Sequence, residues 1–248
     1  MRGEVVDAVA EQCAELRGIL GADGWDAPTR CDGWDVGDVV MHLAQTNEMA
    51  IGSLTRTYDS VLAGLTDGLP PAADVDEGAA LMVARDRADR DATYSRWSVS
   101  VDRLLSAFAA ADPDEKVQWV AGQLRVRTLA TTRLAETWIH TGDVAGALGL
   151  ELAPQPRLRH VARLAWRTLP YAFQKAGRPA PGPTAFRLTG PDGALWGFVP
   201  DEPAVNVVTG SGAELCNLAA QRCRPGDTSL VAEGPDGAAV LDLVRTYA

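Results

Sequence analysis

The positions of His42 and His140 relative to Glu136 are the strongest indication of chemistry in a chain that has only three histidines. Glu136 and His140 stand four residues apart in a segment with helical periodicity, so both side chains leave the same helix face about one turn apart. His42 lies in an earlier predicted helix, and in an antiparallel bundle a residue near the start of one helix can meet residues late in another. The three residues predict a His/Glu/His metal site with one open coordination position, as in catalytic metal sites.

The same Glu/His spacing also forms surface hydrogen bonds without a metal, and the spacing alone leaves this alternative open. The neighbouring residues are apolar: Leu134, Ala135, Trp138 and Ile139. A carboxylate buried in such surroundings is costly unless a cation compensates its charge, which favours the metal interpretation.

Other charged side chains are candidates for a supporting role. Asp143, one turn beyond His140, can accept a hydrogen bond from the imidazole, or it can lie on the surface near the helix end. Arg222 and Arg224, at the end of a predicted helix over 212–223, can bind a carboxylate or phosphate, or complement the helix C-terminus. His160 is flanked by arginines and is predicted to lie on a solvated basic face.

Common catalytic motifs are absent from the sequence. It contains no P-loop, no dinucleotide-binding glycine fingerprint, no nucleophile elbow and no H-E-x-x-H motif. Its four cysteines form no C-x-x-C pair, which excludes a zinc knuckle and a thioredoxin-type motif: Cys13, Cys31, Cys216 and Cys223. We expect free thiols in a reducing compartment.

Helical periodicity dominates the part of the chain that carries the candidate ligands. It predicts helices over 4–20, 36–65, 84–111, 125–148 and 155–175, the last with a kink at Pro170. Asp35 and Asp38 predict an acidic capping box at the start of the second helix. After Pro183, short β-type runs alternate with turns and two helix candidates. This order predicts an α+β fold, in which a four-helix bundle is followed by a small α/β domain.

Composition limits the function classes. A length of 248 residues favours two domains, which we place at 1–152 for the bundle and 153–248 for a connecting helix and the α/β domain. The net charge of −10 argues against a nucleic-acid partner. No apolar run is long enough to span a membrane, and Glu4 and Asp7 interrupt the region where a signal peptide would be apolar. We therefore expect a cytoplasmic protein with a small-molecule substrate, as a monomer or a homodimer.

Three stretches resemble a known family: GWDAPTRCDGWDVGDVVMHLAQTNEMA, TRLAETWIHTGDVAGALGL and the tail TGPDGALW…VTGSGAELCNLAAQR. They are similar to the DinB-like superfamily, in the branch of mycothiol-dependent maleylpyruvate isomerase and its actinobacterial metal-binding relatives. The most specific parts are the G-W-D-V-x-D-x-x-x-H-L and E-T-W-x-H-x-x-D-V blocks. The resemblance covers nearly the whole chain and implies a DinB-like bundle followed by an α/β domain similar to sterol carrier protein.

The resemblance also implies a site and its chemistry. A divalent metal, most often zinc, binds to the residues that match His42, Glu136 and His140, the same three that the spacing proposes. The thiol of mycothiol takes the open position as a thiolate and adds to an electron-poor substrate, since a metal lowers the pKa of a bound thiol. Arg222 aligns best with a cationic residue that binds the acidic substrate or the thiol.

Three hypotheses follow. The first is a metal-dependent enzyme that uses a low-molecular-weight thiol, as an S-transferase or a thiol-assisted isomerase, with Asp143 supporting a ligand and Arg222 binding an anionic group. The second keeps the metal and drops the thiol, as a Lewis-acid isomerase, cyclase or hydrolase acting on a secondary metabolite. The third is a non-catalytic module whose α/β domain binds an apolar ligand. Trp25 and Trp34, in the loop before the second helix, are predicted to pack in the core or to line the pocket.

Overall fold

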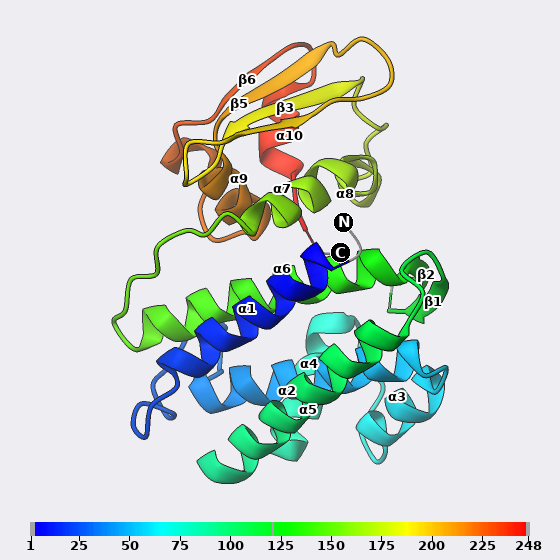
Figure 1. The fold of residues 1–248 in the computed structure, drawn as a ribbon, viewed down its shortest axis with the longest axis vertical. Coiled ribbons are helices and arrows are strands. Elements are labelled where there is room, and N and C mark those ends of the chain that lie inside the picture. Colours follow the sequence, from blue (N-terminus) through cyan, green and yellow to red (C-terminus); the bar gives the residue numbers. More distant parts are fainter. Residues whose placement is uncertain (1–2, 121, 247–248) are drawn as a thin grey trace. The chain divides into compact units, whose positions relative to one another are not determined.

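Residues 3–120 and 122–246 are described by the computed structural model of the chain (Figure 1). The chain divides into two units, residues 1–152 and residues 153–248. The first unit is helical and the second contains a four-stranded sheet. The predicted α+β class is therefore confirmed.

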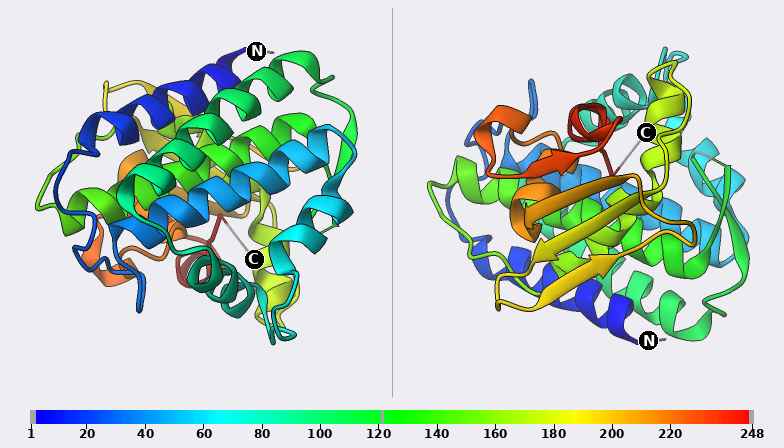
Figure 2. Two further views of the ribbon diagram at one scale, coloured as in Figure 1. Left: turned by 90° about the horizontal axis from the view of Figure 1, so that it is seen from below. Right: turned by 90° about the horizontal axis from the view of Figure 1, so that it is seen from above.

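Four long helices form the bundle of the first unit: α1 (Glu4–Ile19), α2 (Val36–Leu54), α5 (Arg90–Ala110) and α6 (Val126–Ala147). Helix α2 packs against α5 and α6, and α1 packs against the same two helices (Figure 2, left). The bundle interior is apolar, with Leu16, Leu43, Trp97, Leu104 and Leu134 all fully buried. This packing sets α2 beside α6, the two helices on which the candidate ligands lie.

The predicted helix over 36–65 is wrong in one respect, because it is two helices, α2 and α3 (Tyr58–Thr66). Arg56 adopts a left-handed backbone with φ of 61°. The Thr57 amide donates to the Gly52 carbonyl at 2.7 Å and the Arg56 amide donates to the Ser53 carbonyl at 3.4 Å. These two bonds end α2 in a Schellman motif, in which arginine stands where glycine is usual.

The predicted helix over 84–111 starts too early, because α5 begins at Arg90 and residues 84–86 end another helix, α4 (Val75–Asp86), which the sequence did not predict. Asp89 starts α5 because its side chain accepts a hydrogen bond from the Ala92 amide. A hairpin that the sequence did not predict, β1 (Lys116–Trp119) and β2 (Gly122–Arg125), connects α5 to α6. Val117 of this hairpin is buried against the apolar end of the bundle.

The second unit begins with α7 (Leu158–Arg167) and α8 (Leu169–Lys175), so the predicted helix over 155–175 breaks at Thr168, with Pro170 in the first turn of α8. Its sheet has the order β4-β3-β5-β6 (Figure 2, right), with bounds Thr184–Thr189 for β3, Leu195–Phe198 for β4, Asn206–Ser211 for β5 and Val231–Glu233 for β6. Strands β3 and β5 are parallel, and the other pairs are antiparallel. Helices α9 (Gly212–Ala219) and α10 (Gly237–Leu243) and the 3₁₀ turn η1 (Pro225–Asp227) complete the unit.

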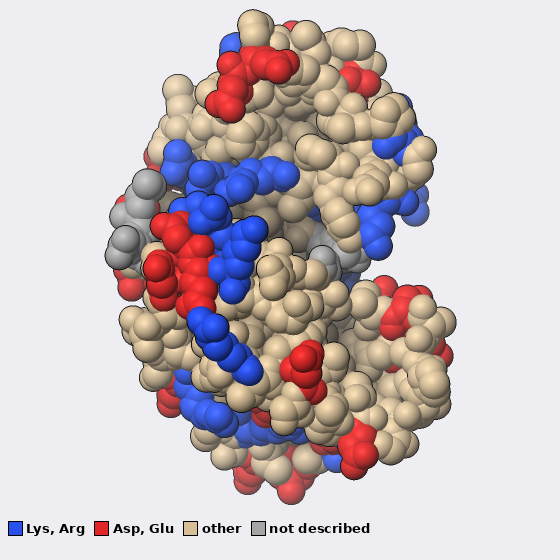
Figure 3. Space-filling model, turned by 90° about the vertical axis from the view of Figure 1, so that its right-hand side faces the viewer, with Lys and Arg blue, Asp and Glu red and all other residues tan. Residues whose placement is uncertain are grey.

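The surface of the helical unit carries charges of both signs. Acidic and basic side chains lie next to one another on the face in the lower half of Figure 3. None of the helices in the described part of the chain combines the length and the hydrophobicity that a bilayer crossing requires.

Candidate metal centre

The start of α2 is firmly anchored, and this fixes the position of His42 two turns into the helix. The Asp38 amide donates to Asp35 Oδ1 at 2.8 Å, and the Asp35 amide donates to Asp38 Oδ2 at 3.3 Å. The predicted capping box is therefore confirmed. Asp38 also accepts two hydrogen bonds from the Arg87 guanidinium, at 2.8 and 2.6 Å. This bidentate pair fastens the first turn of α2 to the segment that joins α4 to α5.

The structure brings His42, Glu136 and His140 together. Glu136 Oε1 lies 2.8 Å from His42 Nε2 and 3.5 Å from His140 Nε2. One potential ligand atom from each residue lies within 4.8 Å of those of the other two. Their side chains are 10%, 12% and 26% exposed for His42, His140 and Glu136, so the carboxylate is the most accessible of the three.

The protonation states around Glu136 reflect this packing. Burial alone would raise the pKa of Glu136, but hydrogen bonds from His140 and His42 outweigh it and hold that pKa well below its ordinary value. Burial also lowers the pKa of His42, which favours the neutral imidazole that a metal requires. The pKa of His140 lies well above its ordinary value, because hydrogen bonds led by that with Asp143 outweigh the effect of burial. A metal at His140 Nε2 therefore has to displace a proton.

Asp143 lies behind His140 rather than on the surface. Its Oδ2 atom is 3.0 Å from His140 Nδ1, and its side chain is 1% exposed. A carboxylate in this position accepts the Nδ1 proton, fixes the tautomer and directs Nε2 towards Glu136. The other histidine is oriented differently, because no residue in the described part of the chain is a hydrogen-bond partner for His42 Nδ1. The His42 ring instead packs against Trp34, with ring centroids 5.0 Å apart.

Two residues that contact the candidate ligands or the helix turns beside them were not among the predicted site residues. Arg133 is 2% exposed, and its Nη2 donates to Thr46 Oγ1 at 2.9 Å and to Asn47 Oδ1 at 3.2 Å. The Thr46 hydroxyl donates in turn to the His42 carbonyl at 2.9 Å, so Arg133 ties α6 to the turn of α2 that follows His42. The only signal for this in the sequence is that Arg133 stands one turn before Glu136 on the same face.

Cys31 is the second unpredicted residue. Its Sγ atom lies 3.4 Å from Asp143 Oδ2 and 3.9 Å from His140 Nδ1. It belongs to the loop between α1 and α2, where no periodicity relates a side chain to the helices. Sequence reasoning therefore recognised only a thiol outside any disulfide, which the structure confirms for Cys31.

The remaining candidates lie in the second unit. Arg222 follows α9, which ends at Ala219 and is shorter than predicted, and its Nη1 donates to the Ala220 carbonyl at 3.1 Å. Because Arg222 belongs to a different unit from Glu136, its approach to the metal residues stays a prediction. His160, on α7, belongs to none of the groups of potential metal ligands found among the described residues.

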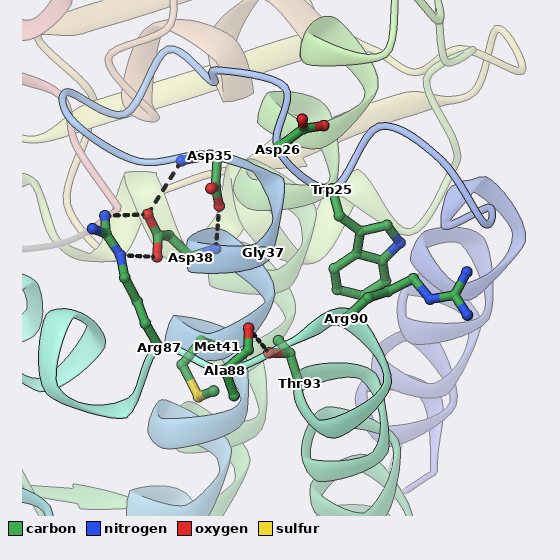
Figure 4. Close-up of a pocket in the computed structure, with 10 residues that line it drawn as sticks. All are labelled: Trp25, Asp26, Asp35, Gly37, Asp38, Met41, Arg87, Ala88, Arg90 and Thr93. Carbon is green, nitrogen blue, oxygen red and sulfur yellow. Dashed lines mark hydrogen bonds and ion pairs between the residues drawn. The ribbon is translucent and has the colours of Figure 1, made fainter.

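A separate pocket of about 220 Å³ opens beside the N-terminus of α2 (Figure 4). Trp25 lines one side of it, and the Arg87–Asp38 ion pair lines another. The residues that line it include none of the three candidate ligands. Of the two tryptophans in the preceding loop, Trp25 therefore lines this pocket, and Trp34 packs against the candidate ligand His42.

Comparison with known proteins identifies the family of the chain. Residues 6–145 match the family model described as the mycothiol maleylpyruvate isomerase N-terminal domain. The chain belongs to this family. The match includes α2 and all but the last two residues of α6, and with them every candidate ligand of the bundle. The resemblance predicted from the sequence is confirmed.

Several known proteins resemble the chain along most of its length. Two uncharacterized proteins of Mycobacterium tuberculosis, MT0041 and Rv0036c from two strains, are each 32% identical to it over 230 residues, which is 92% of this chain and 88% of theirs. Crystal structures of the mycothiol-dependent maleylpyruvate isomerase and of a mutant of it match with TM-scores of 0.61 and 0.59. Both cover 96% of this chain and 94% of their own at 18% identity, a likeness that concerns the fold.

Proposed function

We propose that this family member is a divalent-metal-dependent enzyme that activates a low-molecular-weight thiol for attack on a small, electrophilic, acidic substrate. One observation carries the proposal: donor atoms of His42, Glu136 and His140, supplied by two helices, lie within 4.8 Å of one another in a site that is only partly exposed. The known substrate of the structural relatives, maleylpyruvate, and their thiol, mycothiol, are the first compounds to test.

The residues present fit a divalent cation, with zinc as the first choice. Two imidazole nitrogens and one carboxylate oxygen form a ligand set that zinc takes in catalytic sites, where a fourth position stays open. The ionised Glu136 carboxylate, whose pKa is held low, supplies a negative charge beside two histidines. A divalent cation bound there would lower the pKa of a thiol or water ligand and so make a nucleophile available at neutral pH.

The side chains of this chain would supply orientation and charge. Asp143 accepts the Nδ1 proton of His140 and thereby keeps Nε2 directed into the site. Trp34 packs against His42 and limits the rotation of that imidazole. Arg222 would bind the acidic group of the substrate or of the thiol, since a guanidinium forms paired hydrogen bonds with carboxylates.

The test begins with elemental analysis of the purified protein and of His42→Ala. We expect His42→Ala to contain about one equivalent of divalent metal less than the wild type. His160→Ala is the matched control, because it removes a histidine that belongs to neither group of candidate ligands, and it should retain the metal. Equal metal content in His42→Ala and the wild type would contradict the ligand set.

Turnover of maleylpyruvate is then measured with mycothiol, with another thiol and without thiol. Turnover that requires a thiol supports the proposal. Turnover without any thiol would instead favour the Lewis-acid hypothesis. Ligand binding that survives metal loss, with no turnover under any condition, would favour the non-catalytic module.

A further inference from the structure

We propose that Cys31, Asp143 and the Nδ1 atom of His140 form a second metal-ligating set, which takes a thiophilic divalent cation. This inference goes beyond the proposed function, because it uses the opposite nitrogen of His140 and requires no enzymatic activity. It rests on a cluster of three different donor types, a thiol, a carboxylate and an imidazole, that two separate segments bring together.

The separations between the donor atoms fit a single small cation. Cys31 Sγ lies 3.4 Å from Asp143 Oδ2 and 3.9 Å from His140 Nδ1, and the last two atoms are 3.0 Å apart. With zinc bonds of about 2.3 Å to sulfur and about 2.0–2.2 Å to nitrogen and oxygen, ligand atoms at the corners of a tetrahedron lie about 3.3–3.6 Å apart. The three atoms therefore need to move by only a few tenths of an ångström, and a fourth position stays open.

Hydrogen bonds order the backbone at Cys31 before any cation binds. The Cys31 amide donates to Thr29 Oγ1 at 3.1 Å, and the Thr29 hydroxyl donates to the Trp34 carbonyl at 2.8 Å. The Trp34 amide donates back to the Cys31 carbonyl at 3.0 Å. A backbone that is already ordered loses little conformational freedom when the side chain it carries binds a cation, which favours affinity.

Among the four cysteines, Cys31 is the one placed for this role. Burial raises the pKa of Cys13 to about 11, and it raises the pKa of Cys216 further still. Cys223 is half-buried and lies in the second unit, outside the groups of potential metal ligands found among the described residues. Cys31 is half-buried, so a cation can reach it, and it has an imidazole and a carboxylate beside it.

The chemistry of the set determines which cations it takes. Binding replaces the Cys31 thiol proton and the His140 Nδ1 proton, so two protons leave for each cation bound. A thiolate with an imidazole favours zinc, cadmium and similar ions over magnesium and calcium, which prefer oxygen ligands. His140 Nε2 remains directed towards Glu136, so with both sets filled the ring would bridge two cations as an imidazolate.

Cadmium is the probe, because its bond to a thiolate produces an ultraviolet charge-transfer band that nitrogen and oxygen ligands do not produce. The full-length, metal-free protein is titrated with cadmium, and bound cadmium is counted by elemental analysis. We expect the band in the wild type and in Cys223→Ser. In Cys31→Ser we expect the band to disappear and the amount of bound cadmium to fall by one equivalent. Magnesium in excess should leave the band unchanged.

His42→Ala separates this inference from the proposed function, since it disables the first set alone. The charge-transfer band should persist in His42→Ala. The amount of bound cadmium should fall by one equivalent, because the ion in the first set has no thiolate ligand. A wild type without the band, or a band unchanged in Cys31→Ser, would overturn the second set and leave the three groups as a hydrogen-bonded cluster. The second set would also be overturned if the wild type bound one equivalent of cadmium and the band were lost in both Cys31→Ser and His42→Ala. A single ion would then use residues of both sets.

Discussion

Replacing Asp143 with asparagine tests whether the carboxylate behind His140 strengthens metal binding at the His42, Glu136 and His140 set. Asp143 is 1% exposed and accepts the His140 Nδ1 proton at 3.0 Å. Asparagine has nearly the same shape but carries no charge, so the imidazole becomes a weaker donor to the metal. The change keeps the packing and removes one electrostatic contribution.

Loss of such a partner typically weakens metal binding by about 10–100-fold, or about 1.4–2.7 kcal/mol. We expect the upper part of this range, because solvent does not screen a carboxylate that is buried to this extent. The sign depends on pH. Asp143 also raises the pKa of His140, so in the wild type a proton competes with the metal below that raised pKa. Asp143→Asn lowers this pKa and with it the competition, so the loss of affinity should be full at high pH and shrink as the pH falls.

The affinity for zinc is measured by competition with a chromophoric chelator across a range of pH. Both proteins carry Cys31→Ser, so that the second set does not contribute. Asp102→Asn, which makes the same chemical change at a side chain that is 75% exposed, is the matched control and should leave the affinity unchanged. The reasoning would be refuted if Asp143→Asn left the affinity for zinc unchanged at high pH. It would also be refuted if the loss of zinc affinity grew as the pH fell.

Three further predictions concern single residues. Glu136→Gln should reduce the metal retained after dialysis against a chelator, because it removes the charge of a ligand, and retention at the wild-type level in elemental analysis would remove Glu136 from the site. Arg222→Ala should raise the KM for an acidic substrate in steady-state assays while leaving metal content alone, and an unchanged KM would exclude Arg222 from substrate binding. Arg133→Met should lower the free energy of unfolding, measured with denaturant, by about 1–3 kcal/mol, since it leaves the buried acceptor of Asn47 without its donor; Arg133→Lys should restore part of the loss, and a Met variant as stable as the wild type would show that the tie between α2 and α6 contributes nothing.

Helical spacing was sufficient to predict that His42, Glu136 and His140 lie together. Glu136 and His140 share one helix, so their relative position follows from the helical repeat alone. His42 required in addition that α2 and α6 pack side by side, which the order of amphipathic helices made a reasonable expectation. The capping box at Asp35 and Asp38 was equally local, and it was found for the same reason.

What the sequence did not reveal depends on irregular backbone or on long-range contacts. The end of α2 has arginine at the left-handed position, so the usual glycine signal for a helix end is missing at Arg56. The strands of the hairpin β1–β2 have four residues each, too few for an alternating pattern to stand out. Cys31 reaches His140 from a loop, across 109 positions of sequence, and no periodic rule covers such a contact.

The division of the candidate ligands between α2 and α6 would have a consequence for the lifetime of a metal-bound protein. His42 and Glu136 are 94 positions apart in the chain, so a cation held by both acts as a reversible crosslink between distant segments. An ion present at a hundred times its dissociation constant adds about 2.7 kcal/mol to the stability of the folded state. The supply of metal in the cell would then regulate how much of this protein survives proteolysis, as well as how much of it is active.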